Sequence, residues 1–147
     1  MAARGATPAE RAGLASATAA MLSSGVAARA GQPALDENAL SAAWVDLGAQ
    51  MGVSAGSERL SISLRTLTEA DLLERSVALA VRQLAEPSWT DAVWVRDRQR
   101  WLASIKEAQT RPGTHAGRAF SQAVYGDHPY GREVTAATLE AISVGDM

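Results

Sequence analysis

The sequence predicts an α+β fold, because two hydrophobic periods alternate along one chain of ordinary domain length. Most of its apolar segments repeat at the 3, 4, 7 spacing of an amphipathic helix, whereas residues 60–65 alternate apolar and polar side chains like a strand. The 147 residues are 47% hydrophobic, which is enough for a core and argues against wholesale disorder. We therefore expect a single domain over residues 1–147.

The first two predicted elements are helices. Thr7, Pro8 and Glu10 form a helix-start pattern, and the helix that follows places Leu14, Ala17, Thr18, Met21 and Leu22 on one face before Gly25. A second helix is predicted from Asp36 to Leu47. Its apolar stripe consists of Leu40, Ala43, Trp44 and Leu47.

The middle of the chain changes to the period of a strand. Leu60, Ile62 and Leu64 alternate with polar residues and predict a half-buried strand. Residues 50–55 form a shorter candidate strand, and Gly56-Ser57 is a turn between the two. Two strands do not make a stable sheet by themselves. Either strand partners are missing from this chain, so that the domain is incomplete, or the chain contains further strands that these patterns do not reveal.

Helices return in the second half of the sequence. Thr68 is expected to cap a long helix that ends at Pro87. Its stripe consists of Leu73, Val77, Ala80, Val81 and Leu84. Thr90 begins another helix, which Pro112 is expected to end, and a shorter helix covers residues 116–124.

The chain ends in two local patterns. The loop from Tyr125 to Gly131 reads Tyr-Gly-Asp-His-Pro-Tyr-Gly and is rich in turn residues. The segment from Ser143 to Asp146 is a capping box for a helix that the sequence does not continue, which again suggests an incomplete domain.

Composition excludes several classes of function. The formal net charge of −2 gives no electrostatic footprint for nucleic acid, and no apolar run is long enough to span a bilayer. The absence of cysteine excludes disulfides, thiolate zinc sites and cysteine nucleophiles. Lys106 is the only lysine beside 13 arginines, a bias that suggests a GC-rich bacterial genome.

The two histidines, His115 and His128, are weak candidates for metal ligands. They lie 13 residues apart with no recognised ligand spacing. We interpret His115 as a surface residue and His128 as a residue that shapes its loop. No nucleophile elbow of the Gly-x-Ser-x-Gly type is present, which argues against an independent serine hydrolase.

The order of elements and several short motifs resemble the insulinase, pitrilysin and mitochondrial-processing-peptidase family of zinc peptidases. The matching motifs are Gly13-Leu14-Ala15, Met21-Leu22, Leu47-Gly48-Ala49, Ser61-Ile-Ser-Leu64 and the loop from Tyr125 to Gly131. This resemblance implies a two-layer domain with helices packed on one face of a mostly antiparallel sheet.

Active members of that family carry an inverted zinc motif, His-x-x-Glu-His, on the first helix. In the frame that Gly13-Leu14-Ala15 and Met21-Leu22 define, the two histidines fall on Ser16 and Ala20 and the glutamate on Ala19. The third ligand falls on Ser104, with Asp97 and Glu107 as other possible registers. None of Ser16, Ala19 and Ala20 supplies an imidazole or a carboxylate, so the resemblance implies a fold that has lost its zinc.

The family works as pairs of similar domains or subunits, one of which carries zinc while the other helps to enclose the peptide substrate. The resemblance therefore implies a non-catalytic partner of an active zinc-peptidase subunit or domain, with zinc only in that partner. The alternative is a segment of a longer peptidase whose zinc domain lies outside this sequence. Bacterial relatives are often exported, so the periplasm is favoured over the cytoplasm.

Overall fold

A computed structural model describes residues 8–147 of the chain. The described residues form two compact units, one over Ser16–Thr90 and the other over residues 8–15 together with Asp91–Met147. We call them the central unit and the terminal unit. The α+β class predicted from the sequence is confirmed, and every strand pair is antiparallel.

The first helix is shorter than the sequence predicts. A 3-10 turn, η1 (Ala9–Arg11), is followed by α1 (Leu14–Met21), which lies mostly in the central unit. Gly13 between them has a φ of 101°, a left-handed conformation that interrupts a right-handed helix. The prediction of a continuous helix from Pro8 was therefore wrong, and its proposed cap Thr7 lies outside the described residues.

The central unit contains a short strand pair that the sequence analysis missed. Strand β1 (Gly25–Val26) pairs with β2 (Leu35–Asp36), and two-residue strands carry no detectable alternation. Asp36 then caps α2 (Glu37–Asp46) by accepting a hydrogen bond from the Ala39 amide at 2.8 Å. The prediction of a helix from Asp36 to Leu47 is confirmed.

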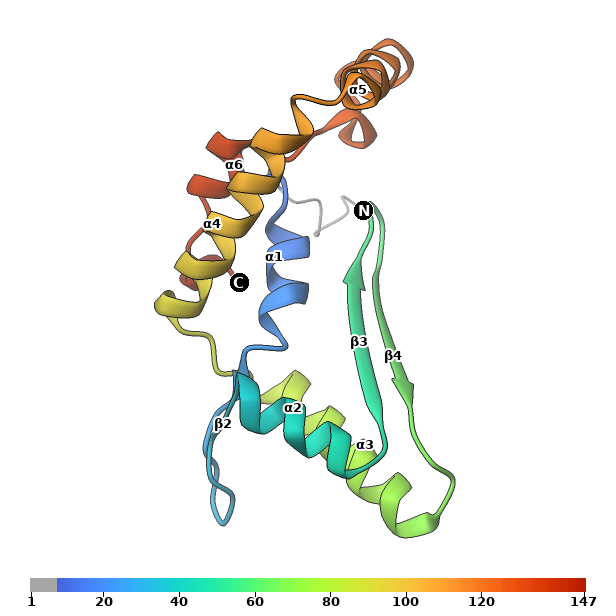
Figure 1. Cartoon of the computed structure of the whole chain (residues 1–147), viewed down its shortest axis with the longest axis vertical. Coiled ribbons are helices and arrows are strands. Elements are labelled where there is room, and N and C mark those ends of the chain that lie inside the picture. The colour runs from blue at the N-terminus through green and yellow to red at the C-terminus, as the bar shows by residue number, and fades with distance from the viewer. Residues whose placement is uncertain (1–7) are drawn as a thin grey trace, which may run out of the picture. The chain divides into compact units, whose positions relative to one another are not determined.

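The predicted hairpin is also confirmed, but its exposure is not as expected. Strands β3 (Gln50–Ala55) and β4 (Leu60–Arg65) pair along their whole length around the turn at Gly56, and Figure 1 shows them as a long antiparallel ribbon. Every residue of β4 is exposed in the described chain, including Ile62 at 47%. The expectation of a half-buried strand was therefore wrong for this structure, because nothing within residues 8–147 covers the apolar side of β4.

Helix α3 (Ala70–Ala85) follows the hairpin and buries an unexpected face. Its N-cap is Glu69 and not Thr68. The residues that it buries are Ser76, Ala80, Arg82 and Gln83. The predicted apolar stripe is largely exposed, with Leu73 at 42% and Val81 at 56%. The side of α3 that packs against the rest of the central unit therefore carries mainly hydrogen-bonding side chains.

The core of the central unit is small and contains both apolar and polar buried side chains. Val26, Leu40, Trp44 and Ala80 form its buried apolar cluster, and Met51 packs against that cluster from the sheet. Arg82 donates a hydrogen bond of 2.8 Å to the carbonyl of Ala27, which ties α3 to the segment between β1 and β2. These contacts fix α2, α3 and the base of the hairpin as one group.

The terminal unit is built on α4 (Asp91–Ala108), α5 (Pro112–Tyr125), η2 (Pro129–Gly131), α6 (Ala136–Glu140) and η3 (Val144–Asp146). Its core contains Trp94, Leu139 and Ile142, and the Trp94 indole donates to the carbonyl of Ile142 at 2.9 Å. Pro112 occupies the first turn of α5, where its missing amide proton costs nothing, so it begins this helix and does not end the one before.

The last predicted motif is present as a turn. Ser143 and Asp146 form a reciprocal capping box around η3, and Arg11 forms an ion pair with Asp146. Hydrogen bonds from the backbone and hydroxyl of Ser143, with the Arg11 charge, lower the pKa of Asp146 below its ordinary value.

Candidate functional site

The positions that the sequence resemblance predicts for the zinc motif lie on α1. Ser16 and Ala20 are exposed and one helical turn apart, which is the spacing of the two histidines in the inverted motif. Ala19, at the position of the glutamate, is 4% exposed. At these three positions the side chains are one hydroxyl and two methyl groups.

The position predicted for the third ligand lies on α4 in the terminal unit. Ser104 is exposed there. Asp97 and Glu107, the two other candidates for the third ligand, each pair with an arginine close to them in the sequence. Asp97 accepts from Arg96 at 2.8 Å and from Arg100 at 3.3 Å, and Glu107 pairs with Arg111.

These residues do not fit a zinc ion. A catalytic zinc site needs three imidazole, thiolate or carboxylate ligands, and Ser16, Ala19 and Ala20 supply none. Within residues 8–147, no group of three histidine, cysteine, aspartate or glutamate side chains is placed to hold a metal. We therefore derive no metal-dependent reaction step from Ser16, Ala19 and Ala20.

The two histidines lie at separate places in the terminal unit and have local roles. His115 is exposed on α5, with Nε2 at 2.7 Å from the carbonyl of Gln109. His128 accepts a hydrogen bond from the Tyr130 amide at 3.2 Å, and its ring packs edge-on against Tyr130. The interpretation of His128 as a residue that shapes its loop is confirmed.

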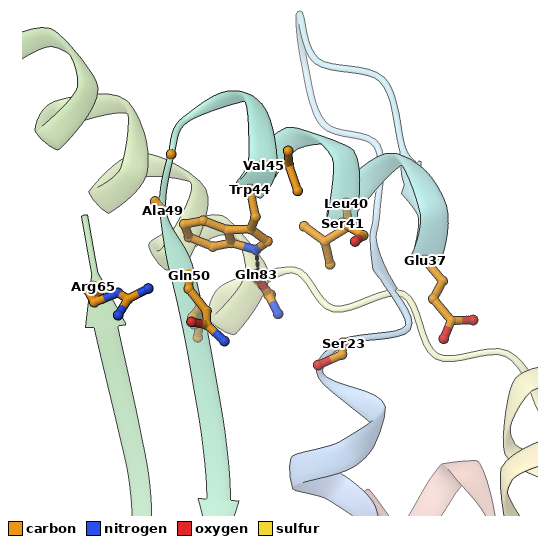
Figure 2. A pocket seen from close by; sticks show the side chains of 12 residues that line it. Ser23, Glu37, Leu40, Ser41, Trp44, Val45, Ala49, Gln50, Arg65 and Gln83 are labelled. Carbon is orange, nitrogen blue, oxygen red and sulfur yellow. Dashed lines mark hydrogen bonds between the residues drawn. The ribbon is translucent and has the colours of Figure 1, made fainter. Parts of the chain in front are cut away.

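The described part of the central unit contains an open pocket at the base of the hairpin (Figure 2). Its volume is about 580 Å³, within the range of about 300–1,000 Å³ typical of small-ligand sites. The lining comes from α2, β3, the end of β4, α3 and the turn after α1. The lining residues are Ser23, Glu37, Leu40, Ser41, Trp44, Val45, Gly48, Ala49, Gln50, Met51, Arg65 and Gln83.

One buried side chain fixes the geometry of this pocket. Gln83 accepts a hydrogen bond from the Trp44 indole at 2.8 Å and donates one to the carbonyl of Leu22 at 3.0 Å. It is 3% exposed and joins α3 to α2 and to the end of α1. The sequence did not predict a buried Gln83, because a single glutamine between apolar residues gives no signal that it will be buried.

Charge is distributed unequally along the pocket. Figure 2 shows the guanidinium of Arg65 and the carboxylate of Glu37 at opposite ends, with the Trp44 ring between them. The arrangement offers a cation, an aromatic wall and an anion in that order. It can bind and orient a ligand, and it carries no nucleophile paired with a base.

Comparison with solved structures gives the fold a family context. The chain aligns with the crystal structure of a peptidase M16 inactive domain from Pseudomonas fluorescens at a TM-score of 0.74 and 27% sequence identity. The chain has a peptidase M16-like fold. This agrees with the insulinase-like architecture that the sequence motifs predict.

The alignment covers 92% of this chain but only 35% of the M16 neighbour, so the chain spans about a third of that protein's length. No protein-family profile and no curated protein sequence matches this chain. None of the helices within residues 8–147 is long and apolar enough to cross a bilayer.

Proposed function

We propose that this chain is a non-catalytic M16-type homologue that helps to enclose a peptide substrate beside an active zinc-peptidase subunit or domain. One observation supports this most directly. The described fold is M16-like, and in the register that the sequence motifs predict, Ser16, Ala19 and Ala20 stand where active M16 peptidases carry the two histidines and the glutamate of the inverted zinc motif.

The exposed apolar surface of the central unit supports a role in assembly. Leu73, Val77 and Val81 repeat along one side of α3 and are each more than 40% exposed. A row of exposed apolar side chains along one helix face is a candidate surface for protein interaction. A partner that covers this stripe would remove it from water.

A second reading is favoured by the extent of the structural match. Since the chain spans 35% of its M16 neighbour, it also fits a segment of a longer peptidase whose zinc domain lies elsewhere in the same polypeptide. The neighbouring coding sequence distinguishes the two. A His-x-x-Glu-His motif in the same reading frame supports the longer peptidase, and one in an adjacent gene supports the partner subunit.

The decisive experiment measures zinc content and peptide hydrolysis for the purified chain, alone and mixed with a candidate partner zinc peptidase. We expect less than stoichiometric zinc and no hydrolysis from the chain alone, and faster hydrolysis by the mixture than by the peptidase alone. Stoichiometric zinc in the chain alone, or a mixture no faster than the peptidase, would overturn the proposal.

A further inference from the structure

The pocket at the base of the hairpin has an available cation at one end. Arg65 is the last residue of β4 and pairs with Gln50 of β3 through the sheet backbone. Its guanidinium is exposed and, among residues 8–147, has no ion pair or side-chain hydrogen bond. A planar guanidinium of this kind binds carboxylates through two parallel hydrogen bonds.

The wall beside Arg65 is apolar although it is made partly of a tryptophan. The Nε1 hydrogen of Trp44 is already donated to Gln83, so the indole offers the ligand its ring and not a donor. Ala49 and Met51, both half-buried, extend this apolar lining. The wall therefore suits an aliphatic or aromatic side chain.

The opposite end of the pocket carries an acidic residue. Glu37 lies there, at the start of α2, on the far side of Trp44 from Arg65 (Figure 2). Of the two ends, the end with Arg65 is the one that attracts a carboxylate. Ser41 and Gln50 add hydrogen-bonding groups along the lining, which suit peptide amides.

We propose that this pocket binds the C-terminal end of a peptide, with the terminal carboxylate on Arg65 and the last side chain against Trp44. A C-terminal leucine or phenylalanine carries its carboxylate and its apolar side chain on the same Cα, so both reach adjacent groups of the pocket together. An internal aspartate or glutamate has no apolar group in that position. The choice of a peptide as the ligand rests on the proposed function. The position of Arg65 beside the apolar wall is what favours the free C-terminal end of that peptide.

The test uses the whole chain and two matched probes, N-acetyl-Ala-Leu-Phe with a free carboxylate and the same peptide as its C-terminal amide. Binding is measured by calorimetry, and amide chemical shifts locate the site. We expect the acid to bind about tenfold more tightly than the amide, which is the effect of one charge-assisted hydrogen-bonded pair. The shifts should change around Trp44 and Arg65.

Two arginine variants make the test specific. Arg65→Gln should abolish the preference for the acid, whereas Arg59→Gln should retain it, because Arg59 lies in the exposed turn at the other end of the hairpin. Equal affinity for acid and amide, a preference that survives in Arg65→Gln, or no binding of either peptide at millimolar concentration would overturn the proposal.

These measurements use no peptidase, so they are independent of the enclosing role. If the chain prefers the acid but does not accelerate hydrolysis by the candidate partner peptidase, the pocket assignment stands and the proposed function fails. If the chain accelerates hydrolysis without preferring the acid, the proposed function stands and the pocket assignment fails.

Discussion

The indole of Trp44 and the carboxamide of Gln83 form a buried hydrogen bond of 2.8 Å between α2 and α3. Gln83 also donates to the carbonyl of Leu22, so one side chain satisfies polar groups on two other segments. A buried polar group that has no partner costs far more than a satisfied one gains, so this glutamine holds both segments in place.

Replacing this glutamine with an apolar side chain of similar size should destabilise the protein. We expect Gln83→Met to lower the free energy of unfolding by about 2–4 kcal/mol, because each buried group left without a partner costs about 1–3 kcal/mol. Urea unfolding followed by circular dichroism measures the change. Gln50→Met, on the exposed side of β3, is the control and should stay within about 0.5 kcal/mol of wild type. Equal effects of the two variants would contradict the role given to Gln83.

The capping box at the end of the chain predicts a pH dependence. Hydrogen bonds from Ser143 and the charge of Arg11 lower the pKa of Asp146 in the folded state. Its contribution to stability is therefore complete above the ordinary aspartate pKa of about 4 and is lost as the pH falls through the lowered folded value. Asp146→Asn removes this titration. We expect the difference in melting temperature between wild type and Asp146→Asn to be constant from pH 7 to about pH 5 and to shrink below pH 4. A difference that grows on acidification would be inconsistent with a lowered pKa.

Restoring the side chains of the zinc motif on α1 should not restore activity. In the variant Ser16→His, Ala19→Glu, Ala20→His, the two histidines occupy exposed positions one turn apart, but Ser104 still supplies no third ligand. Ala19 is also 4% exposed, so a glutamate there carries a burial cost of its own. We expect no peptide hydrolysis and less than one equivalent of zinc by elemental analysis. Robust hydrolysis by this variant would show that a third ligand is available elsewhere in the chain.

Substitutions in the exposed stripe of α3 should weaken association with a partner without changing the free energy of unfolding. Val77→Lys with Val81→Glu changes two side chains that are 44% and 56% exposed. Surface changes of this kind alter the free energy of unfolding by about 0.5 kcal/mol or less. We expect an unchanged urea midpoint for the chain alone but weaker association with the candidate partner peptidase in analytical ultracentrifugation. Arg75→Lys, on the polar side of the same helix, should leave both quantities unchanged. Association that is unaffected by the valine substitutions would exclude the stripe as the contact surface.

Local patterns in the sequence determined most elements of this protein. The helix from Asp36 to Leu47 and the strands at residues 50–55 and 60–65 follow from capping and periodicity, which depend only on neighbouring residues. The assignment of Ser16, Ala19 and Ala20 to the zinc-motif positions rests on the resemblance of Gly13-Leu14-Ala15 and Met21-Leu22 to the family motif, and it stays a prediction.

Only the tertiary structure decided which faces are buried. The apolar stripe of α3 is regular in sequence, but the helix buries Ser76 and Gln83, because hydrogen bonds to distant segments fix its rotation. The strand pair at Gly25 and Leu35 and the pocket between Trp44 and Arg65 likewise join residues far apart in the chain. Sequence periodicity depends only on residues a few positions apart. Burial and pockets depend on contacts between segments that are far apart in the chain, and no local pattern predicts which segments meet.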